Sequence, residues 1–114
     1  MQRMRPPVLT AALFVSVASA GARGAGCPPK NVDPAVARGK QAYATCAACH
    51  NMNPALDGAV GPAIKGSSKE LIAARVMKAE YPAGYTPKRA THLMPAQPQM
   101  ANSIDDLAAF LNAP

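Results

Sequence analysis

The sequence predicts a small all-α domain. Three segments, residues 33–50, 67–80 and 103–112, carry helix start signals followed by apolar residues at spacings of three and four. No segment shows the apolar–polar alternation of a strand, and no internal repeat is present. The stretches between the three segments are rich in Gly, Pro and Asn, which is typical of loops.

The first helix is expected to begin at Asp33-Pro34. Asp is a favoured N-cap, and Pro suits the first helical position, where the N–H has no partner within the helix. Val36, Gly39 and Tyr43 then fall on one face. Because a glycine inside a helix costs about 1 kcal/mol relative to alanine, we expect another helix to approach closely at Gly39.

The other two helices have similar start signals. Ser67 and Glu70 form the pattern of a capping box, which predicts a helix through about Glu80. Ser103 precedes two acidic residues and is expected to cap the last helix. The predicted core-facing residues are Leu71, Ile72, Val76 and Met77 in the second helix and Leu107, Phe110 and Leu111 in the last.

The run Cys46-Ala47-Ala48-Cys49-His50 carries the chemistry of the chain. C-x-x-C-H is the attachment motif of a c-type haem, in which each thiol adds to one vinyl group of the porphyrin. We therefore expect one covalently attached haem c, with His50 as an axial ligand of its iron. A zinc module would need Cys27 or His92 as a further ligand, but zinc sites usually show a second pair of ligands at short spacing, and none exists here.

Two stretches are predicted to be irregular. Residues 51–66 are rich in Gly, Pro and Asn, and residues 81–102 carry four prolines without periodicity. An irregular segment of this length in so small a domain usually has a function. Covering one face of a haem is a function that fits residues 81–102.

The N-terminus has the pattern of a secretory signal peptide over residues 1–20. Arg3 and Arg5 precede a short apolar run, which ends at Ala18-Ser19-Ala20. A transmembrane anchor is the alternative, but the run is about half of the roughly 20 residues that a spanning helix needs. Cleavage near Ala20 would leave residues 21–32 as a flexible leader of an exported, periplasmic protein, and c-type haem attachment in bacteria takes place outside the cytoplasm.

The net positive charge and Cys27 indicate what the chain could bind or contact. Without Arg3 and Arg5, ten Lys and Arg face six acidic residues, a balance that suits a redox partner with an acidic docking surface. Nucleic-acid binding is not expected, because the charges are scattered and lack interleaved aromatic residues. Cys27 is left over as a free thiol or, alternatively, as a lipidated residue, which would be the chain's own contact with a membrane.

The chain resembles the class I cytochromes c. The resemblance covers roughly residues 33–112 and rests on RGKQAYATCAACH, GPAIKG, LMPAQP and SIDDLAAFLNA. It implies a cytochrome c domain over residues 33–114, with three to four short helices around one covalently bound haem. It also implies that the first and last helices cross where Gly39, Tyr43 and Phe110 meet.

The same resemblance implies how the haem is held. In that family the carbonyl of a Gly-Pro segment accepts the proton on the far nitrogen of the haem-ligating histidine, which here places Pro62 on His50. Such a bond fixes the tautomer and the ring orientation of a ligand. Ile64 would then pack against the porphyrin.

The second axial ligand is expected to be Met94. Met94-Pro95 lies in the Pro-rich segment and resembles the ligand loops of short bacterial cytochromes. Met100, His92 and an open site are the alternatives. Met52 is too close to His50 to reach the other face of the ring, and Met77 lies on an apolar helix stripe, where core packing is expected.

Four functions compete at this stage. The first is a freely diffusing one-electron carrier with both axial positions filled and therefore no small-molecule substrate. A dedicated cytochrome subunit of a periplasmic dehydrogenase or oxidase would have the same site and a fixed partner. An open-site haem sensor or peroxidase would not depend on Met94, and the zinc module would carry no haem. No pattern of an independent catalytic site is present, so an enzyme is not expected.

Overall fold

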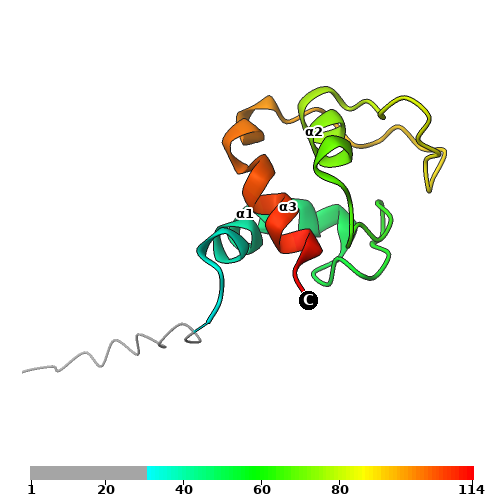
Figure 1. Ribbon diagram of the computed structural model, residues 1–114. Coiled ribbons are helices and arrows are strands. Elements are labelled where there is room, and N and C mark those ends of the chain that lie inside the picture. The colour runs from blue at the N-terminus through cyan, green and yellow to red at the C-terminus, as the bar shows by residue number, and fades with distance from the viewer. Residues whose placement is uncertain (1–30) are drawn as a thin grey trace, which may run out of the picture.

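The computed structural model describes residues 31–114 (Figure 1). The predicted signal peptide, most of the leader and Cys27 lie outside the described residues. The described chain forms α1 (Pro34–His50), α2 (Lys69–Lys78), the 3-10 helix η1 (Pro98–Ser103) and α3 (Ile104–Asn112). It contains no strand over residues 31–114, so the all-α prediction is confirmed.

Helix α1 begins and ends as its sequence predicts. Asp33 is the N-cap, and its Oδ1 accepts a hydrogen bond of 2.8 Å from the N–H of Ala35, with Pro34 at the first helical position. The helix continues through the C-x-x-C-H run and ends at His50. The next residue, Asn51, has φ 79° and ψ 147°, so the chain turns sharply directly after the histidine.

Helices α1 and α3 cross in contact, as expected. Gly39 is buried, and a Cβ added to it would lie 1.9 Å from the carbonyl oxygen of Asp106 and 2.7 Å from Cβ of Phe110. Next to this crossing, the rings of Tyr43 and Phe110 pack with centroids 5.2 Å apart. The mid-helix glycine therefore permits the close approach of the two helices, which explains its place in the sequence.

The predicted boundaries of α2 were slightly wrong. Ser68, rather than Ser67, is the N-cap, and its Oγ accepts a hydrogen bond of 3.2 Å from the N–H of Leu71. Ser67 instead donates its hydroxyl to the carbonyl of Ile64 and belongs to the preceding turn. The helix ends at Lys78, since Ala79 adopts the left-handed conformation and caps it.

The start of α3 also differs from the prediction. Residues 98–102, expected to be irregular, belong to η1 (Pro98–Ser103), which runs directly into α3. Ser103 occupies the N-cap position, but its side chain makes no capping hydrogen bond. Asp105 and Asp106 in the first turn supply the negative charge that a helix N-terminus favours.

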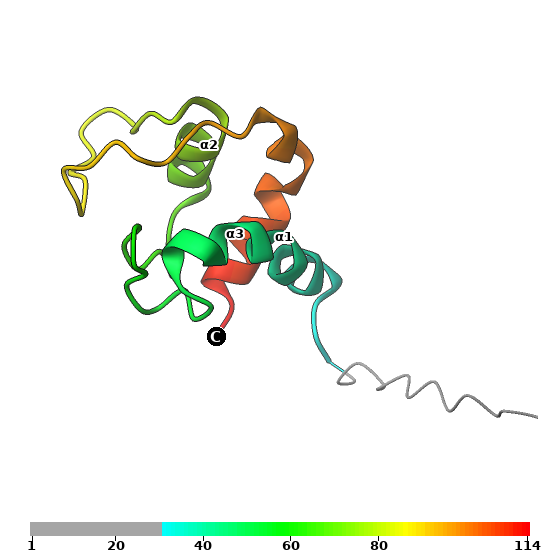
Figure 2. The same cartoon turned by 180° about the vertical axis from the view of Figure 1, so that it is seen from behind.

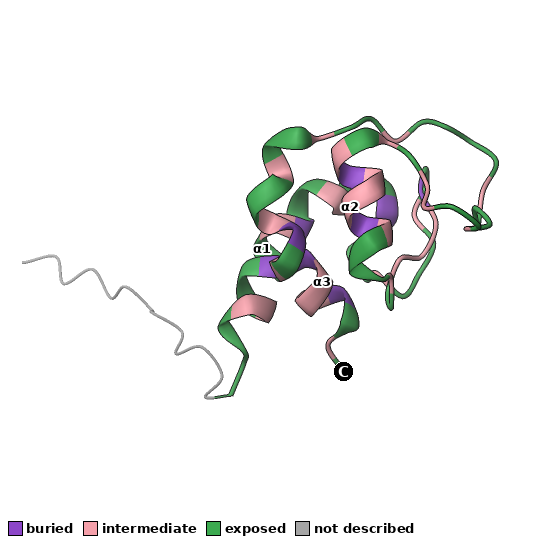
Figure 3. Ribbon diagram, turned by 45° about the horizontal axis from the view of Figure 1, so that its top comes forward, coloured by how far each residue is buried: buried purple, intermediate pink, exposed green. Residues whose placement is uncertain are grey.

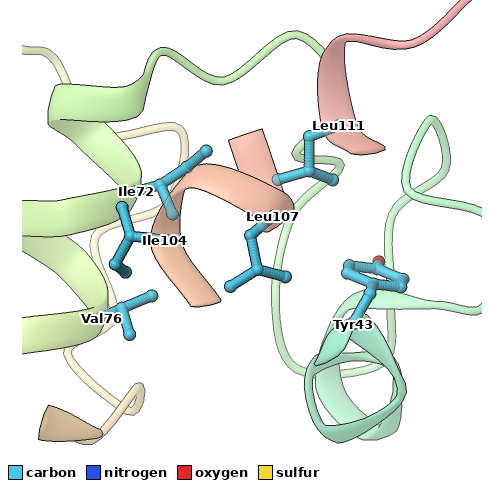
Figure 4. Close-up of a cluster of buried hydrophobic side chains, with 6 residues drawn as sticks. All are labelled: Tyr43, Ile72, Val76, Ile104, Leu107 and Leu111. Atoms are coloured by element: carbon cyan, nitrogen blue, oxygen red, sulfur yellow. The ribbon is translucent and has the colours of Figure 1, made fainter. Parts of the chain in front are cut away.

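The buried core lies where α1, α2 and α3 face one another (Figures 2 and 3). Its side chains gather on one side of α2 and between α1 and α3 (Figure 4); they are Tyr43, Ile72, Val76, Ile104, Leu107 and Leu111. Leu71 and Met77 of the predicted stripe, and Phe110, are only partly buried. Among the described residues, no helix is long and apolar enough to cross a membrane.

Candidate functional site

A large pocket opens beside this core. It is lined by the last turns of α1, residues 60–64, one face of α2, residues of the 81–97 segment, and two leucines of α3. The pocket encloses about 1190 Å³ of empty space, including the solvent at its mouth. The predicted site residues Cys46, Cys49, His50, Pro62, Ile64 and Met94 all line it.

The two cysteines come from the last two turns of α1. Their spacing of three places both side chains toward the same side of the helix. Both thiols are free; Cys49 is exposed and Cys46 is partly buried. Burial, and secondarily the neighbouring Cys49, raise the pKa of the Cys46 thiol. The reactive groups at this end of the pocket are therefore the two free thiols and the imidazole of His50.

His50 is the buried polar residue of this part of the chain, with 9% of its surface exposed. Its Nδ1 lies 2.8 Å from the carbonyl oxygen of Pro62. A carbonyl can only accept, so Nδ1 carries the proton and donates it, and Nε2 of the neutral ring keeps a lone pair. The hydrogen bond thus leaves Nε2 as the nitrogen that can bind a metal.

The Gly-Pro segment reaches the histidine because Gly61 lies against its ring. A Cβ added to Gly61 would come within 2.5 Å of both Cε1 and Nδ1 of His50. The N–H of Gly61 donates to the carbonyl of Cys49 at 2.9 Å. The loop therefore hydrogen-bonds to the end of α1 through Gly61 and to the imidazole of His50 through Pro62.

Asp57 holds the same loop from its other side. Its Oδ1 accepts a hydrogen bond of 2.7 Å from the N–H of Ala63, and its main-chain carbonyl accepts one of 3.1 Å from Nδ2 of Asn51. The carbonyl of Asn51 in turn accepts the hydroxyl of Tyr43 at 2.7 Å. Asn51, which follows His50, and Ala63, which follows Pro62, are therefore both held by hydrogen bonds. Burial and then Cys46 raise the pKa of Tyr43, so its hydroxyl stays protonated as a donor.

The alternative iron ligands are placed differently from Met94. Met94 is partly buried, packs against the core and lines the pocket. Met100 also packs against the core but is not among the pocket-lining residues. His92 is exposed and Met52 is 80% exposed, and neither they nor Met77 line the pocket.

Cationic and phenolic side chains line the remaining edge of the pocket. Arg75 stacks on the ring of Tyr81 at 4.2 Å, and Tyr81 stacks on Tyr85 with centroids 5.5 Å apart. Lys88 and Arg89 line the pocket as well. By contrast, Lys69 forms an ion pair with Asp105 and is not a pocket-lining residue.

Sequence reasoning missed the roles of Asn51, Asp57 and Gly61. The signals were present but unspecific, since Asn-x-Asn and Asp-Gly are ordinary turn patterns. Which group each side chain would contact depends on how the loop folds back on α1. Across residues 31–114, no three His, Cys, Asp or Glu side chains gather closely enough to hold a metal ion by themselves.

Comparison with known proteins gives one match. Residues 36–113 match the sequence model of the family described as Cytochrome c, which covers more than half of the chain. No curated protein and no solved structure gave a match.

Proposed function

The chain belongs to the cytochrome c family, whose members transfer electrons through a covalently attached haem c, and from this premise we propose that it is a periplasmic one-electron carrier with His50 and Met94 as the iron ligands. The proposed export rests on the signal-peptide pattern of residues 1–20. When bound, haem c supplies an iron that alternates between its ferric and ferrous forms.

The residues of the pocket fit this cofactor. Cys46 and Cys49 are free thiols at the attachment spacing, and His50 offers Nε2 while Nδ1 is bonded to Pro62. The rest of the lining is largely apolar, with Ile64 on the loop that carries Pro62. A porphyrin needs a hydrophobic surrounding of this kind, with its polar edge left for cationic or phenolic groups.

The observation that carries the proposal is the presence of Met94 in the same pocket as His50. A thioether favours ferrous over ferric iron and raises the reduction potential, as suits an electron carrier. If His50 and Met94 both hold the iron, no coordination position would remain for a substrate. This favours a carrier over the open-site sensor or peroxidase.

The remaining residues have supporting tasks. The Pro62 carbonyl keeps the His50 ring in one tautomer and one orientation, in which Nε2 would hold the iron. Ile72, Leu107 and Leu111 keep water away from the pocket interior, which also bears on the potential. We propose that an acidic redox partner is attracted by the chain's excess of basic over acidic residues.

The test is spectroscopic. The exported chain is expressed with the c-type maturation machinery, and absorption spectra of the oxidised and reduced forms are recorded for the wild type and Met94→Ala. We expect covalent haem, low-spin spectra, and a sulfur-to-iron charge-transfer band that Met94→Ala lacks. Met100→Ala is the matched control, because it removes the other core-packed methionine of this region and should keep the band.

Other outcomes point elsewhere. A band lost in Met100→Ala and kept in Met94→Ala would move the ligand to Met100. A high-spin wild type that binds carbon monoxide readily in the ferrous form would indicate an open site. A chain without covalent haem would contradict the proposal as a whole.

A further inference from the structure

The segment that carries Met94 has little secondary structure to hold it. Residues 81–97 contain no helix or strand and include three prolines. The segment runs out from the end of α2 and returns alongside that helix (Figures 1 and 2), where the N–H of Gln97 donates to the carbonyl of Val76 at 2.6 Å. Between its ends, Met94 needs some other anchor to stay at the pocket.

The anchor is a pair of consecutive basic residues. Nη1 of Arg89 donates to the carbonyl of Val60 at 2.9 Å, and Nη2 donates to that of Gly58 at 3.4 Å. Nζ of Lys88 donates to the carbonyl of Ala63 at 2.7 Å. Within the described part of the chain, every hydrogen bond between residues 81–97 and residues 51–66 comes from these two side chains.

Arg89 also reaches the residue that organises the histidine side of the pocket. Its Nη2 lies 3.7 Å from Oδ2 of Asp57, whose other oxygen binds the N–H of Ala63, next to Pro62. The Arg89 side chain is 31% exposed and that of Asp57 is 68% exposed, so the ion pair is open to water, and the hydrogen bonds to the two carbonyls are the firmer contacts. Hydrogen bonds from a charged donor are stronger than those between neutral groups, and the planar guanidinium can serve several acceptors at once.

We propose that Arg89 is a positioning residue for Met94: by binding the 57–60 turn, its guanidinium joins the methionine-bearing segment to the loop that holds His50. This inference rests on the proposed ligand pair. Anchoring the segment at Arg89 shortens the free chain around Met94 to the span between Arg89 and Gln97. A shorter span has fewer conformations in which the thioether leaves the pocket.

Two measurements on the haem-loaded protein test the proposal. The first is hydrogen exchange of the backbone amide of Gln97, whose N–H binds the carbonyl of Val76, and which reports opening of the segment whichever residue ligates the iron. The second is the limiting rate at which cyanide, at saturating concentration, replaces the internal ligand of the ferric protein. We expect Arg89→Gln to accelerate both by about tenfold to a hundredfold, the range that corresponds to losing one hydrogen bond from a charged donor.

The comparison variants separate positioning from charge. Lys78→Gln removes the same charge from an exposed residue of α2 outside the pocket lining, and both rates should stay at the wild-type values. Arg89→Lys keeps the charge but has a single nitrogen in place of the two that bind the carbonyls of Val60 and Gly58. Its rates should therefore lie between those of the wild type and Arg89→Gln. The double variant Lys88→Gln/Arg89→Gln, which removes both anchors, should exceed either single change.

Wild-type exchange and wild-type cyanide rates in the double variant would overturn the proposal. Equal acceleration in Lys78→Gln and Arg89→Gln would also overturn it, because the effect would then be one of overall charge. A wild type without the sulfur-to-iron band would instead contradict the ligand assignment. In that case the exchange of the Gln97 amide in Arg89→Gln still decides whether Arg89 anchors the segment.

Discussion

His50 is held by contacts whose residues are adjacent in sequence but act in different ways. Pro62 binds its Nδ1 through a carbonyl, and Gly61 leaves the space that the ring itself occupies. The carbonyl cannot be removed by changing a side chain, because every residue has one. Gly61 is therefore the position at which the histidine's surroundings can be altered most directly.

Gly61→Ala should disturb the histidine because its added Cβ would lie 2.5 Å from ring atoms of His50. Either the ring or the loop must move, and such overpacking typically lowers the free energy of unfolding by about 1–3 kcal/mol. We also expect a shifted reduction potential, since the His50–Pro62 hydrogen bond would be strained or broken. Guanidinium chloride unfolding and a redox titration of the haem-loaded variant measure the two effects.

Gly66→Ala is the control for Gly61→Ala. Gly66 has φ 79°, and a Cβ there meets no atom within 4 Å. This variant should lose about 1 kcal/mol for the backbone conformation alone and keep the wild-type potential. A Gly61→Ala protein with wild-type stability and potential would contradict the contact described for the ring.

At the scale of elements, the crossing of α1 and α3 depends on a backbone contact. At Gly39 the space for a Cβ is filled by the carbonyl oxygen of Asp106, 1.9 Å away, which cannot move without shifting α3. In an exposed helix, Gly→Ala stabilises by about 1 kcal/mol. The steric term has the opposite sign here, and it is the larger of the two because the obstructing atom belongs to a helix backbone.

Gly39→Ala should therefore be destabilising by more than about 2 kcal/mol. The measurement is the midpoint of denaturant unfolding of the haem-loaded protein. Ala44→Gly, at an exposed position of the same helix, should cost about 1 kcal/mol through helix propensity alone. A Gly39→Ala protein that is as stable as the wild type would show that the two helices do not cross in this register.

The same pair of helices is joined at its edge by a two-point ion pair. Nε and Nη2 of Arg38 donate to the two carboxylate oxygens of Asp106, each at 2.8 Å. The hydrogen bond from Arg38 lowers the pKa of the Asp106 carboxyl below its ordinary value of 3.8. A carboxyl with a lowered folded-state pKa adds stability above its unfolded pKa, and this contribution disappears as the pH falls through the lowered value.

Asp106→Asn should consequently be less stable than the wild type at neutral pH, and the difference should shrink below pH 3.8. Arg38→Gln breaks the same pair from the other side, so it should show the same pH dependence. Thermal unfolding between pH 2 and pH 7 measures both. A stability difference that persists unchanged at pH 2 would show that the loss comes from packing and not from the ion pair.

Local signals explain what the sequence predicted at this scale. Asp33-Pro34 and the three-and-four spacing are short-range patterns, and α1 and the Gly39 crossing followed from them or from the family resemblance. The capping serine of α2 was misassigned because Ser67 and Ser68 are adjacent, and only the folded turn shows which hydroxyl faces the helix. The Arg89 contacts with residues 58–60 join distant parts of the chain, and no local pattern encodes them.

At the scale of the whole molecule, core and pocket are largely the same set of side chains. Five of the six buried core residues also line the pocket: Tyr43, Ile72, Val76, Leu107 and Leu111. Ile104 is the core residue that does not. The apolar faces of α2 and α3 thus pack partly against each other and partly line the pocket.

This arrangement predicts that the chain does not fold stably without haem. Small domains bury a smaller fraction of their surface than larger ones do, and here much of the apolar surface faces the pocket. Solvent would enter that pocket in the haem-free chain, and the core side chains would lose the contacts that keep them dry. When a bound group completes the core, its binding free energy is in effect folding free energy.

The test of this prediction uses haem-free protein. It is obtained by expressing the chain without the maturation machinery or as the Cys46→Ser/Cys49→Ser variant. Far-ultraviolet circular dichroism should show helix content well below that of the haem-loaded protein, and guanidinium chloride should produce a shallow transition without a clear midpoint. The haem-loaded wild type serves as the reference, and it should unfold cooperatively. Native helix content with a sharp transition in the haem-free chain would mean that α1, α2 and α3 hold one another without the cofactor. The pocket would then be a preformed cavity, and the core described here would be sufficient by itself.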